Sequence, residues 1–364
     1  MIEQHLRRRS GQFSPLVLTA LIVALLAGLP VASVAYNLFL GGTSATWSHL
    51  ASTVLPDYIF NSLALCAGVG AGVAIIGVST AWLTAMHDFP GRRMFEWALV
   101  LPLAVPAYVM AYVYTDFLQF VGPVQTALRD LFGWRYGDYH FPDIRTLPGA
   151  MLMFVFVLYP YVYLLARTAF LERGGGVLEA ARTLGIGPWK AFFTVSLPLA
   201  RPAVAAGVAL ALMETLADYG TVAYFAVDTF TTGIYRAWFS LGDRVASAQL
   251  AAILLGFVLL LVILERFTRG RARYHNTSGR RRPPPALLKG LAGWLATLTC
   301  LLPLVVGFLL PAGLLLRMAL GEGDAQFGER FILLARNSFT LAGLTALIAV
   351  MLAVLMAYSV RLSG

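Results

Sequence analysis

The chain has 364 residues, of which 59% are apolar and only 12% charged, and its formal net charge is +9. Soluble domains carry about 25% charged residues, so this composition excludes an ordinary soluble protein. The basic residues lie in separate loops rather than on one face, which excludes nucleic acid as a partner and favours the anionic headgroups of membrane lipid.

Apolar blocks recur along the whole chain and are long enough to cross a hydrocarbon core of about 30 Å as helices, which satisfy their own backbone hydrogen bonds. The first block is too long for the core of a signal peptide, so we interpret it as an uncleaved anchor. We predict an all-α polytopic membrane protein with spans at 16–40, 58–86, 97–120, 148–170, 201–224, 247–267, 287–316 and 337–360.

The distribution of basic residues predicts the orientation of these spans. If the N-terminus is cytoplasmic, the loops on that side hold most of the 27 Lys and Arg residues, whereas loop 41–57 holds none. We therefore expect residues 1–57 to form a cytoplasmic tail, the first transmembrane helix and a periplasmic loop.

A basic, proline-rich break, GRRRPPPALLKG, separates the first six predicted spans from the last two. After it, the stretch that begins at Asn337 aligns without gaps with the stretch that begins at Asn61, and both start with Asn-Ser. Repeated halves are common in transporters. The sequence predicts a core domain at 58–267, a cytoplasmic linker at 268–290, and the start of a second, incomplete repeat at 291–364.

The most informative stretch, EAARTLGIGPWKAFFTVSLPLARPA, lies between the fourth and fifth predicted spans. We predict a short amphipathic helix at 177–184 with Glu179 in its first turn, where the positive end of the helix favours a carboxylate. Gly185 suits the left-handed position that ends a helix, and Pro188 suits the first turn of the next one.

The second half of this hairpin is expected to expose an apolar surface and then to turn back into the membrane. Pro198 and Pro202 would set the angle of that return. The pattern predicts a compact, rigid protrusion on the cytoplasmic side, whose apolar surface consists of Trp189, Phe192, Phe193 and Val195.

The spacing of this hairpin resembles the EAA loop of the permease subunits of ATP-binding-cassette (ABC) importers, in which isoleucine is usual where this chain has Val195. The resemblance implies a type I importer transmembrane domain, with one six-helix half and the start of a second, in a bacterial inner membrane. It also implies partners: a cytoplasmic ABC ATPase dimer, a periplasmic substrate-binding protein, and a second permease chain or copy. The residues that would couple to the ATPase are Glu179, Ala180, Ala181, Gly185, Val195, Leu197 and Pro198.

No Gly-x-x-x-x-Gly-Lys-Ser/Thr phosphate loop occurs in the sequence, so we expect ATP hydrolysis in the partner subunit, with no cofactor on this chain and no enzymatic activity of its own. The glycines of GVGAGVAIIG lie inside a predicted span, and Gly68 and Gly72 have the spacing of a close helix contact. Cys66 and Cys300 lack the spacing of metal ligands and are expected to be packing residues.

The stretch at 213–243, together with the duplicated layout, resembles the ferric-iron permeases and implies that substrate. Thiamine, sulfate and polyamine permeases share this architecture and remain alternatives. From other classes, an ion-coupled secondary transporter and a membrane scaffold or sensor also remain open. The segment 228–244 alternates aromatic and polar residues and would either meet the binding protein or cap the membrane interface.

Four further residues are candidates for the lining of a transport pathway. Glu214 and Asp218 are four residues apart and would share a face of the fifth span, although a structural role for Asp218 at the outer helix end is the alternative. Tyr159 and Tyr163 flank Pro160, which should kink the fourth span, and could face either a cavity or a packed aromatic surface.

Overall fold

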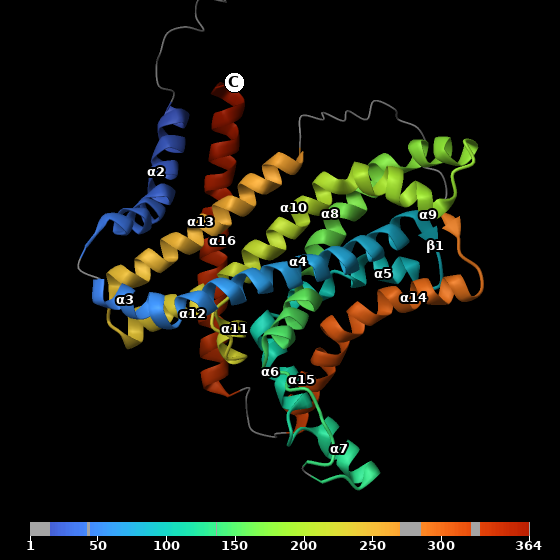
Figure 1. Cartoon of the computed structure of the whole chain (residues 1–364). Coiled ribbons are helices and arrows are strands. Elements are labelled where there is room, and N and C mark those ends of the chain that lie inside the picture. The colour runs from blue at the N-terminus through green and yellow to red at the C-terminus, as the bar shows by residue number, and fades with distance from the viewer. Residues whose placement is uncertain (1–14, 42–43, 136, 270–284, 322–327, 364) are drawn as a thin grey trace, which may run out of the picture. The chain divides into compact units, whose positions relative to one another are not determined.

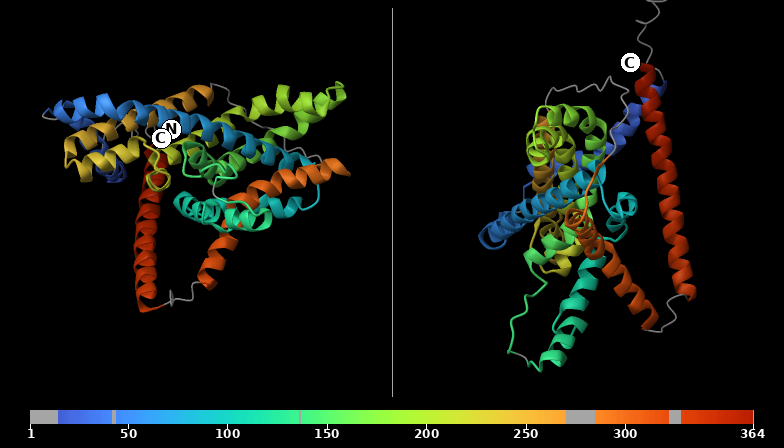
Figure 2. Two further views of the ribbon diagram at one scale, coloured as in Figure 1. Left: turned by 60° about the horizontal axis from the view of Figure 1, so that its bottom comes forward. Right: turned by 90° about the vertical axis from the view of Figure 1, so that its right-hand side faces the viewer.

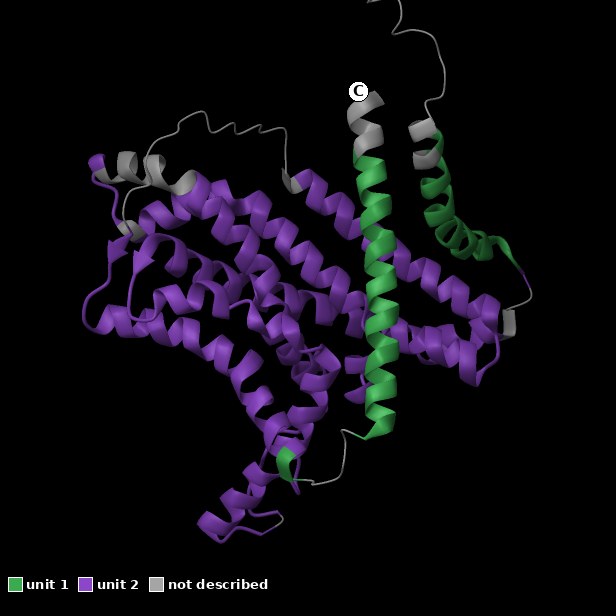
Figure 3. Cartoon of the chain, turned by 180° about the vertical axis from the view of Figure 1, so that it is seen from behind, with its two compact units in different colours: residues 1–40, 320–364 green, residues 41–319 purple. Residues whose placement is uncertain are grey.

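The computed structural model describes residues 15–41, 44–135, 137–269, 285–321 and 328–363, and it is built almost entirely of helices (Figure 1). In these residues, seven helices are long and apolar enough to cross a membrane, or eight if one bent pair counts as a single span. The prediction of an all-α, multi-span protein is therefore confirmed. The chain forms two compact units, residues 1–40 with 320–364, and residues 41–319 (Figure 3).

The first unit consists of two predicted spans from opposite ends of the chain. Helix α2 (Pro15–Tyr36) is followed by a 3-10 turn at Asn37–Phe39, and it lies beside α16 (Glu329–Ser363). Figure 2 shows α16 as one unbroken helix. The described large apolar side chains of both helices are mostly exposed, which suits helices whose surroundings are lipid or other apolar surfaces.

The second unit holds the remaining helices and one pair of short strands. Strands β1 (His87–Asp88) and β2 (Ala286–Leu287) pair in parallel. The π-helical turns lie at Phe192–Ser196, Arg236–Ser240 and Val305–Leu309, and a 3-10 turn lies at Leu101–Ala104. The helices are α3 (Ser44–Thr53), α4 (Leu55–Met86), α5 (Arg92–Ala98), α6 (Ala107–Leu118), α7 (Pro123–Phe132), α8 (Leu147–Thr183), α9 (Pro188–Ala191), α10 (Leu197–Ala217), α11 (Gly220–Tyr224), α12 (Phe230–Tyr235), α13 (Arg244–Arg269), α14 (Leu291–Leu304) and α15 (Leu310–Gly321).

The core of this unit is the contact of α8 with α4 and α10, which run side by side (Figures 1 and 2). Glycines allow this close approach: Gly68 faces Met151, and Gly72 faces Val155, as their spacing predicted. Gly207 of α10 lies against backbone, since a Cβ there would stand 2.7 Å from the Cα of Val162. Backbone cannot move aside as a side chain can, so this crossing depends on glycine.

We expect Gly207→Val to prevent stable packing of α10 on α8, because its added carbons would overlap the backbone of α8, an overpacking that costs about 1–3 kcal/mol or more. Gly256→Val in α13 is the matched control, since a Cβ there would meet nothing within 4 Å. The measurement is the yield and thermal unfolding midpoint of each purified variant. Equal stability of the two variants would contradict this account of the crossing.

The predicted third span, 97–120, is not one straight helix. The chain bends by 89° between Arg92–Ala104 and Ala107–Phe132. Pro102 and Pro106 lie in this region and lack the N–H that a continuous helix needs at those positions. The segment is therefore either a broken span or a re-entrant loop, and the prediction of a single helix is wrong.

Other predicted boundaries also differ from the structure. The fourth span and the separate helix expected at 177–184 form one helix, α8, which continues to Thr183. The run of three glycines at 174–176 lowers helix propensity but does not remove a backbone donor as proline does. The fifth span ends at Ala217 rather than at residue 224, because the chain leaves the helix at Asp218.

The segment after the linker packs into the second unit. The Leu288 N–H donates to the Asp88 carbonyl at 2.9 Å, and the Thr297 hydroxyl donates to the Pro90 carbonyl at 2.9 Å. Further along, the Tyr114 hydroxyl donates to the Val306 carbonyl at 2.6 Å. Residues 285–309 thus extend the core formed by 58–267, while the origin of 291–364 as a second repeat stays a prediction.

Candidate functional site

The hairpin between α8 and α10 has the turn that its sequence predicted. Helix α8 ends at Thr183, and Gly185 follows with φ +74°, the left-handed conformation that glycine adopts most easily. A Cβ at Gly185 would meet nothing within 4 Å, so the requirement is for the backbone angle and not for space. The next helix, α9, begins at Pro188, as expected.

The end of this hairpin presents exposed apolar side chains. Leu184 is 78% exposed, Trp189 75% and Phe193 60%. The rings of Trp189 and Phe193 stack with their centroids 6.5 Å apart and an interplanar angle of 20°. We call these three residues the apolar tip. Large apolar groups gathered on a helical protrusion mark a surface that packs against another protein or against a membrane.

One aromatic residue of the hairpin points inward instead. Phe192 is buried, and its ring lies 4.8 Å from that of Trp82 in α4 and 6.4 Å from that of Phe170 in α8. Trp82 and Phe170 also contact each other, at 5.1 Å. We call Phe192, Trp82 and Phe170 the aromatic anchor. The prediction that Phe192 contributes to the exposed surface is wrong, because its ring completes this buried cluster.

The remaining coupling candidates differ in how far their side chains are buried. Val195 and Leu197 are half-buried, and Leu197 packs against the core, whereas Pro198 is exposed in the first turn of α10. The backbone of Glu179, Ala180 and Ala181 lies within α8, but their side chains are outside the described residues. Their contacts with an ATPase stay a prediction.

A polar cluster joins three helices close to the aromatic anchor. Glu96 of α5 forms ion pairs with Arg92 at 3.2 Å and with Arg167 of α8 at 3.1 Å. The Tyr163 hydroxyl donates to the Glu96 carbonyl at 2.9 Å, and Arg92 Nε donates to the Thr84 carbonyl of α4 at 3.0 Å. Arg167 lies three residues before Phe170, so one turn of α8 contributes Arg167 to the polar cluster and Phe170 to the aromatic anchor.

The sequence analysis did not predict most of the contacts in the aromatic anchor and the polar cluster. The i,i+4 spacing of Arg92 and Glu96 was a readable sign of an ion pair. Nothing local could pair Glu96 with Arg167, or Trp82 with Phe192, because these contacts join residues far apart in the chain.

The two tyrosines proposed for a pathway are packed in the core. Tyr159 and Tyr163 are completely buried, and Tyr163 is held by its bond to Glu96. Of the two alternatives, this structure has the packed aromatic surface. Among the described residues there is also no cluster of three or more His, Cys, Asp or Glu that could hold a metal ion.

Glu214 and Asp218 do not share a helix face, because α10 ends between them. Glu214 is exposed on α10, so its place in a pathway stays a prediction. Asp218 instead caps α11: its carboxylate accepts the Thr221 N–H at 2.7 Å and the Thr221 hydroxyl at 3.1 Å. Burial raises the pKa of the Asp218 carboxyl, while the bonds from Thr221 lower it.

We expect Asp218→Ala to lower the free energy of unfolding by about 1 kcal/mol, because the variant leaves the Thr221 N–H without its cap. Asp218→Asn should have little effect, since an amide oxygen accepts the same bond. The thermal unfolding midpoint of each variant in detergent measures this difference. If Asn destabilises as much as Ala, the charge matters and the capping role is refuted.

The aromatic segment after Asp218 folds as α12 followed by a π-helical turn. Tyr219 and Tyr235 stack with their centroids 3.8 Å apart, and Arg236 forms an ion pair with Asp228 at 2.7 Å. The Thr231 hydroxyl donates to the Asp218 carbonyl at 2.9 Å. The segment 228–240 is thus fixed to the end of α10, and its role towards a binding protein stays a prediction.

In a comparison with protein families, residues 74–273 match the family described as "Binding-protein-dependent transport system inner membrane component". These residues contain α8, the apolar tip, the aromatic anchor and α10.

Individual proteins with related sequences are transport permeases. The chain is 26% identical over 352 residues to the Fe(3+)-transport system permease protein FbpB 2 of Haemophilus influenzae, covering 93% of this chain and 64% of that protein. It is 28% identical over 206 residues to the molybdenum transport system permease protein ModB of Escherichia coli, covering 54% of this chain and 87% of that protein. It is 32% identical over 148 residues to the Escherichia coli sulfate transport system permease protein CysW, covering 41% and 48%.

Among solved structures, the fold is similar to a bacterial ABC transporter involved in the import of the acidic polysaccharide alginate. The match has a TM-score of 0.53 and 16% identity, and it covers 70% of this chain and 93% of that one. The chain spans less than two thirds of the length of the iron permease, but nearly all of the alginate transporter subunit.

Proposed function

The chain belongs to the family of binding-protein-dependent transport system inner membrane components, and we propose that it acts as the membrane-spanning subunit of an ATP-driven importer. The observation that carries this proposal is the hairpin at the end of α8, which combines a glycine turn, an exposed apolar tip and a buried anchor within the family region.

In this proposal, a separate cytoplasmic ATPase binds the apolar tip. Within the described residues, Leu184, Trp189 and Phe193 are exposed, so they are available to a partner. The coupling residues between Glu179 and Pro198 would then sit in or next to that interface. The chain has no phosphate loop of its own, so the hydrolysis of ATP belongs to the partner.

The aromatic anchor is the proposed route by which movement of the tip reaches the membrane helices. Phe192 follows the tip directly and contacts Trp82 of α4 and Phe170 of α8. The ion pairs of Glu96 join α5 to the same end of α8. A displacement of the hairpin would therefore shift α4, α5 and α8 together, because packed aromatic rings transmit strain rather than absorb it.

The orientation follows from the same proposal. The tip and the N-terminus face the cytoplasm, and the turns after α6 and α10 face the periplasm, where a substrate-binding protein would meet them. The distribution of basic residues supports this arrangement. The membrane that we propose for the chain is a bacterial inner membrane. A related solved structure holds an alginate transporter in complex with its alginate pentasaccharide-bound periplasmic protein.

Ferric iron is the substrate that we propose. The similarity to the iron permease covers 93% of the chain, including the segment after the linker, whereas the similarities to the molybdenum and sulfate permeases cover 54% and 41%. Molybdate and sulfate are the competing substrates because those permeases match the core region. Glu214 is the residue that we propose for the pathway lining, since it is exposed on α10.

The test is uptake into proteoliposomes that contain the chain, an ABC ATPase and a binding protein. We expect uptake of radiolabelled ferric iron that requires ATP, with no uptake of molybdate, sulfate or thiamine. ATP-dependent uptake of another solute instead would show that iron is not the substrate, but it would agree with the importer function. Uptake that needs an ion gradient and no ATPase would overturn the proposal in favour of a secondary transporter.

A further inference from the structure

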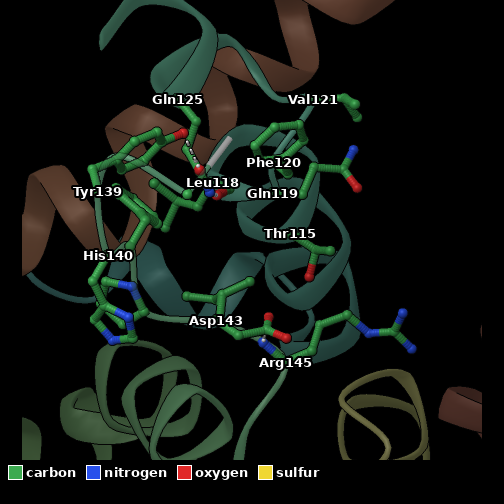
Figure 4. Close-up of a pocket in the computed structure, with 14 residues that line it drawn as sticks. Thr115, Leu118, Gln119, Phe120, Val121, Gln125, Tyr139, His140, Asp143 and Arg145 are labelled. Atoms are coloured by element: carbon green, nitrogen blue, oxygen red, sulfur yellow. Dashed lines mark hydrogen bonds between the residues drawn. The ribbon is translucent and has the colours of Figure 1, made fainter. Parts of the chain in front are cut away.

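An open cavity of about 650 Å³ lies beyond the end of α6 (Figure 4). Its walls come from the last turn of α6, from α7, and from the loop that leads into α8. Figure 2 shows α7 and this loop extending past the ends of the neighbouring helices. Nothing in the sequence pointed to a cavity here, and it is separate from the hairpin described above.

The walls of this cavity are held in place by contacts of their own. Arg129 donates to the Phe120 carbonyl at 2.8 Å and to the Tyr139 hydroxyl at 3.0 Å, and its guanidinium lies 4.3 Å from the centroid of the Phe120 ring. Trp134 stacks between Phe132 and Tyr139, with centroid distances of 4.6 and 5.3 Å. The cavity is therefore preformed, which lowers the entropic cost of binding.

One buried polar group in this cavity has no partner. Thr115 of α6 is only 6% exposed, and its hydroxyl forms no hydrogen bond in the described structure. Its Oγ1 is directed toward Asp143 and Arg145 across the cavity (Figure 4). Buried hydroxyls are normally hydrogen-bonded, so this one points to a group that the cavity is built to receive.

The other polar side chains of the cavity have hydrogen-bond acceptors that are not yet bonded. Asp143 Oδ1 accepts the Arg145 N–H at 2.9 Å, which leaves Oδ2 without a partner among the described residues. The Gln119 amide N–H donates to Asp116 at 3.4 Å, so the side-chain carbonyl oxygen of Gln119 is still able to accept a hydrogen bond. The Tyr139 hydroxyl gives its hydrogen to Gln125 at 2.7 Å.

The cationic side chain at the rim is directed elsewhere. Arg145 Nε donates to the Tyr224 carbonyl at 3.2 Å, and its guanidinium lies 5.7 Å from the centroid of the Tyr224 ring. Figure 4 places this guanidinium on the side of the cavity opposite His140. The free groups are thus a carboxylate oxygen, an amide oxygen, a hydroxyl and an imidazole, next to the aromatic rings of Tyr139 and Phe141. Such a set matches a cationic group that is rich in hydrogen-bond donors.

We propose that this cavity binds an ammonium or guanidinium group, with Thr115 and Asp143 as its principal partners. The group belongs either to a small free amine or to a lysine or arginine side chain of a secreted protein that docks here. This second source rests on the proposed function, which places the cavity on the outer face. The volume of 650 Å³ accommodates either one.

The test is saturation-transfer-difference NMR on the full-length chain in lipid nanodiscs, without ATPase or ATP. The probes are butylamine and a Gly-Lys-Gly peptide blocked at both ends, with the blocked Gly-Glu-Gly peptide as the negative probe. We expect saturable signals on the methylene protons next to the amine. Thr115→Val and Asp143→Asn should each weaken binding about tenfold, because each removes one hydrogen bond and the second also removes the charge.

Asp130→Asn is the matched control, because Asp130 is an exposed acid of α7 outside the cavity. It should bind both probes like the unmodified chain. Equal binding of the two cationic probes assigns the site to free amines, and tighter binding of the peptide assigns it to a protein-borne side chain. The proposal is overturned if neither probe shows saturable binding, or if Thr115→Val and Asp143→Asn bind the probes as tightly as the unmodified chain does. Neither result bears on the proposed transport function.

Discussion

Gly185→Pro is expected to abolish ATP-driven uptake while the chain still inserts into the membrane. Gly185 turns the hairpin at φ +74°, whereas proline fixes φ near −65°. The proline ring cannot adopt the native angle, so the turn cannot form as it does with glycine, and the apolar tip would lose its position relative to the anchor. The measurement is the initial rate of uptake in proteoliposomes, normalised to the amount of inserted chain.

The control for this variant lies two residues further on. Gly187 has no left-handed backbone angle, and a Cβ there would meet nothing within 4 Å. Gly187→Ala should therefore transport at nearly the rate of the unmodified chain. Normal uptake by Gly185→Pro would show that the turn has no part in coupling.

Phe192→Ala is expected to separate ATP hydrolysis from transport. Removing this ring opens the contact with Trp82 and Phe170, a loss of about 3–5 kcal/mol of packing for a buried phenylalanine. The exposed tip remains, so the ATPase should still bind and hydrolyse ATP, but its movement would no longer reach α4 and α8. The measurement is the ratio of substrate molecules imported to ATP molecules hydrolysed, which should fall below the ratio of the unmodified chain.

Trp189→Ala provides the contrasting result. Trp189 is exposed, so its loss should leave the free chain stable, yet removing an aromatic side chain from the centre of an interface costs about 2 kcal/mol or more. We expect weaker binding of the ATPase with an unchanged ratio of import to hydrolysis in the complexes that form. If both variants change the same quantity, the division between tip and anchor is wrong.

The sequence was sufficient where local chemistry decides the structure. The left-handed turn needs glycine, the helix after it can begin with proline, and close helix contacts need small residues, so Gly185, Pro188, Gly68 and Gly72 could be interpreted correctly. The number of spans also followed from the length of the apolar blocks, because a membrane leaves the backbone few alternatives.

The sequence was insufficient to predict the features that depend on tertiary contacts. The third span looked continuous because hydropathy does not register the missing donors of Pro102 and Pro106. Phe192 and Phe193 are adjacent and chemically identical, and only the position of Trp82 determines which one is buried. A structural role for Asp218 was one of two open alternatives, and its bond to Thr221 could not be predicted because it depends on where α10 ends.

The most direct test of the account is site-specific photo-crosslinking of the assembled transporter in its membrane. A benzophenone amino acid replaces Phe193 in the apolar tip, or Leu131, an equally apolar and exposed residue of α7. We predict that position 193 crosslinks to an ATP-binding subunit identified by mass spectrometry, and that position 131 does not. Crosslinks to that subunit from position 131, with none from position 193, would contradict both the coupling role of the hairpin and the proposed orientation.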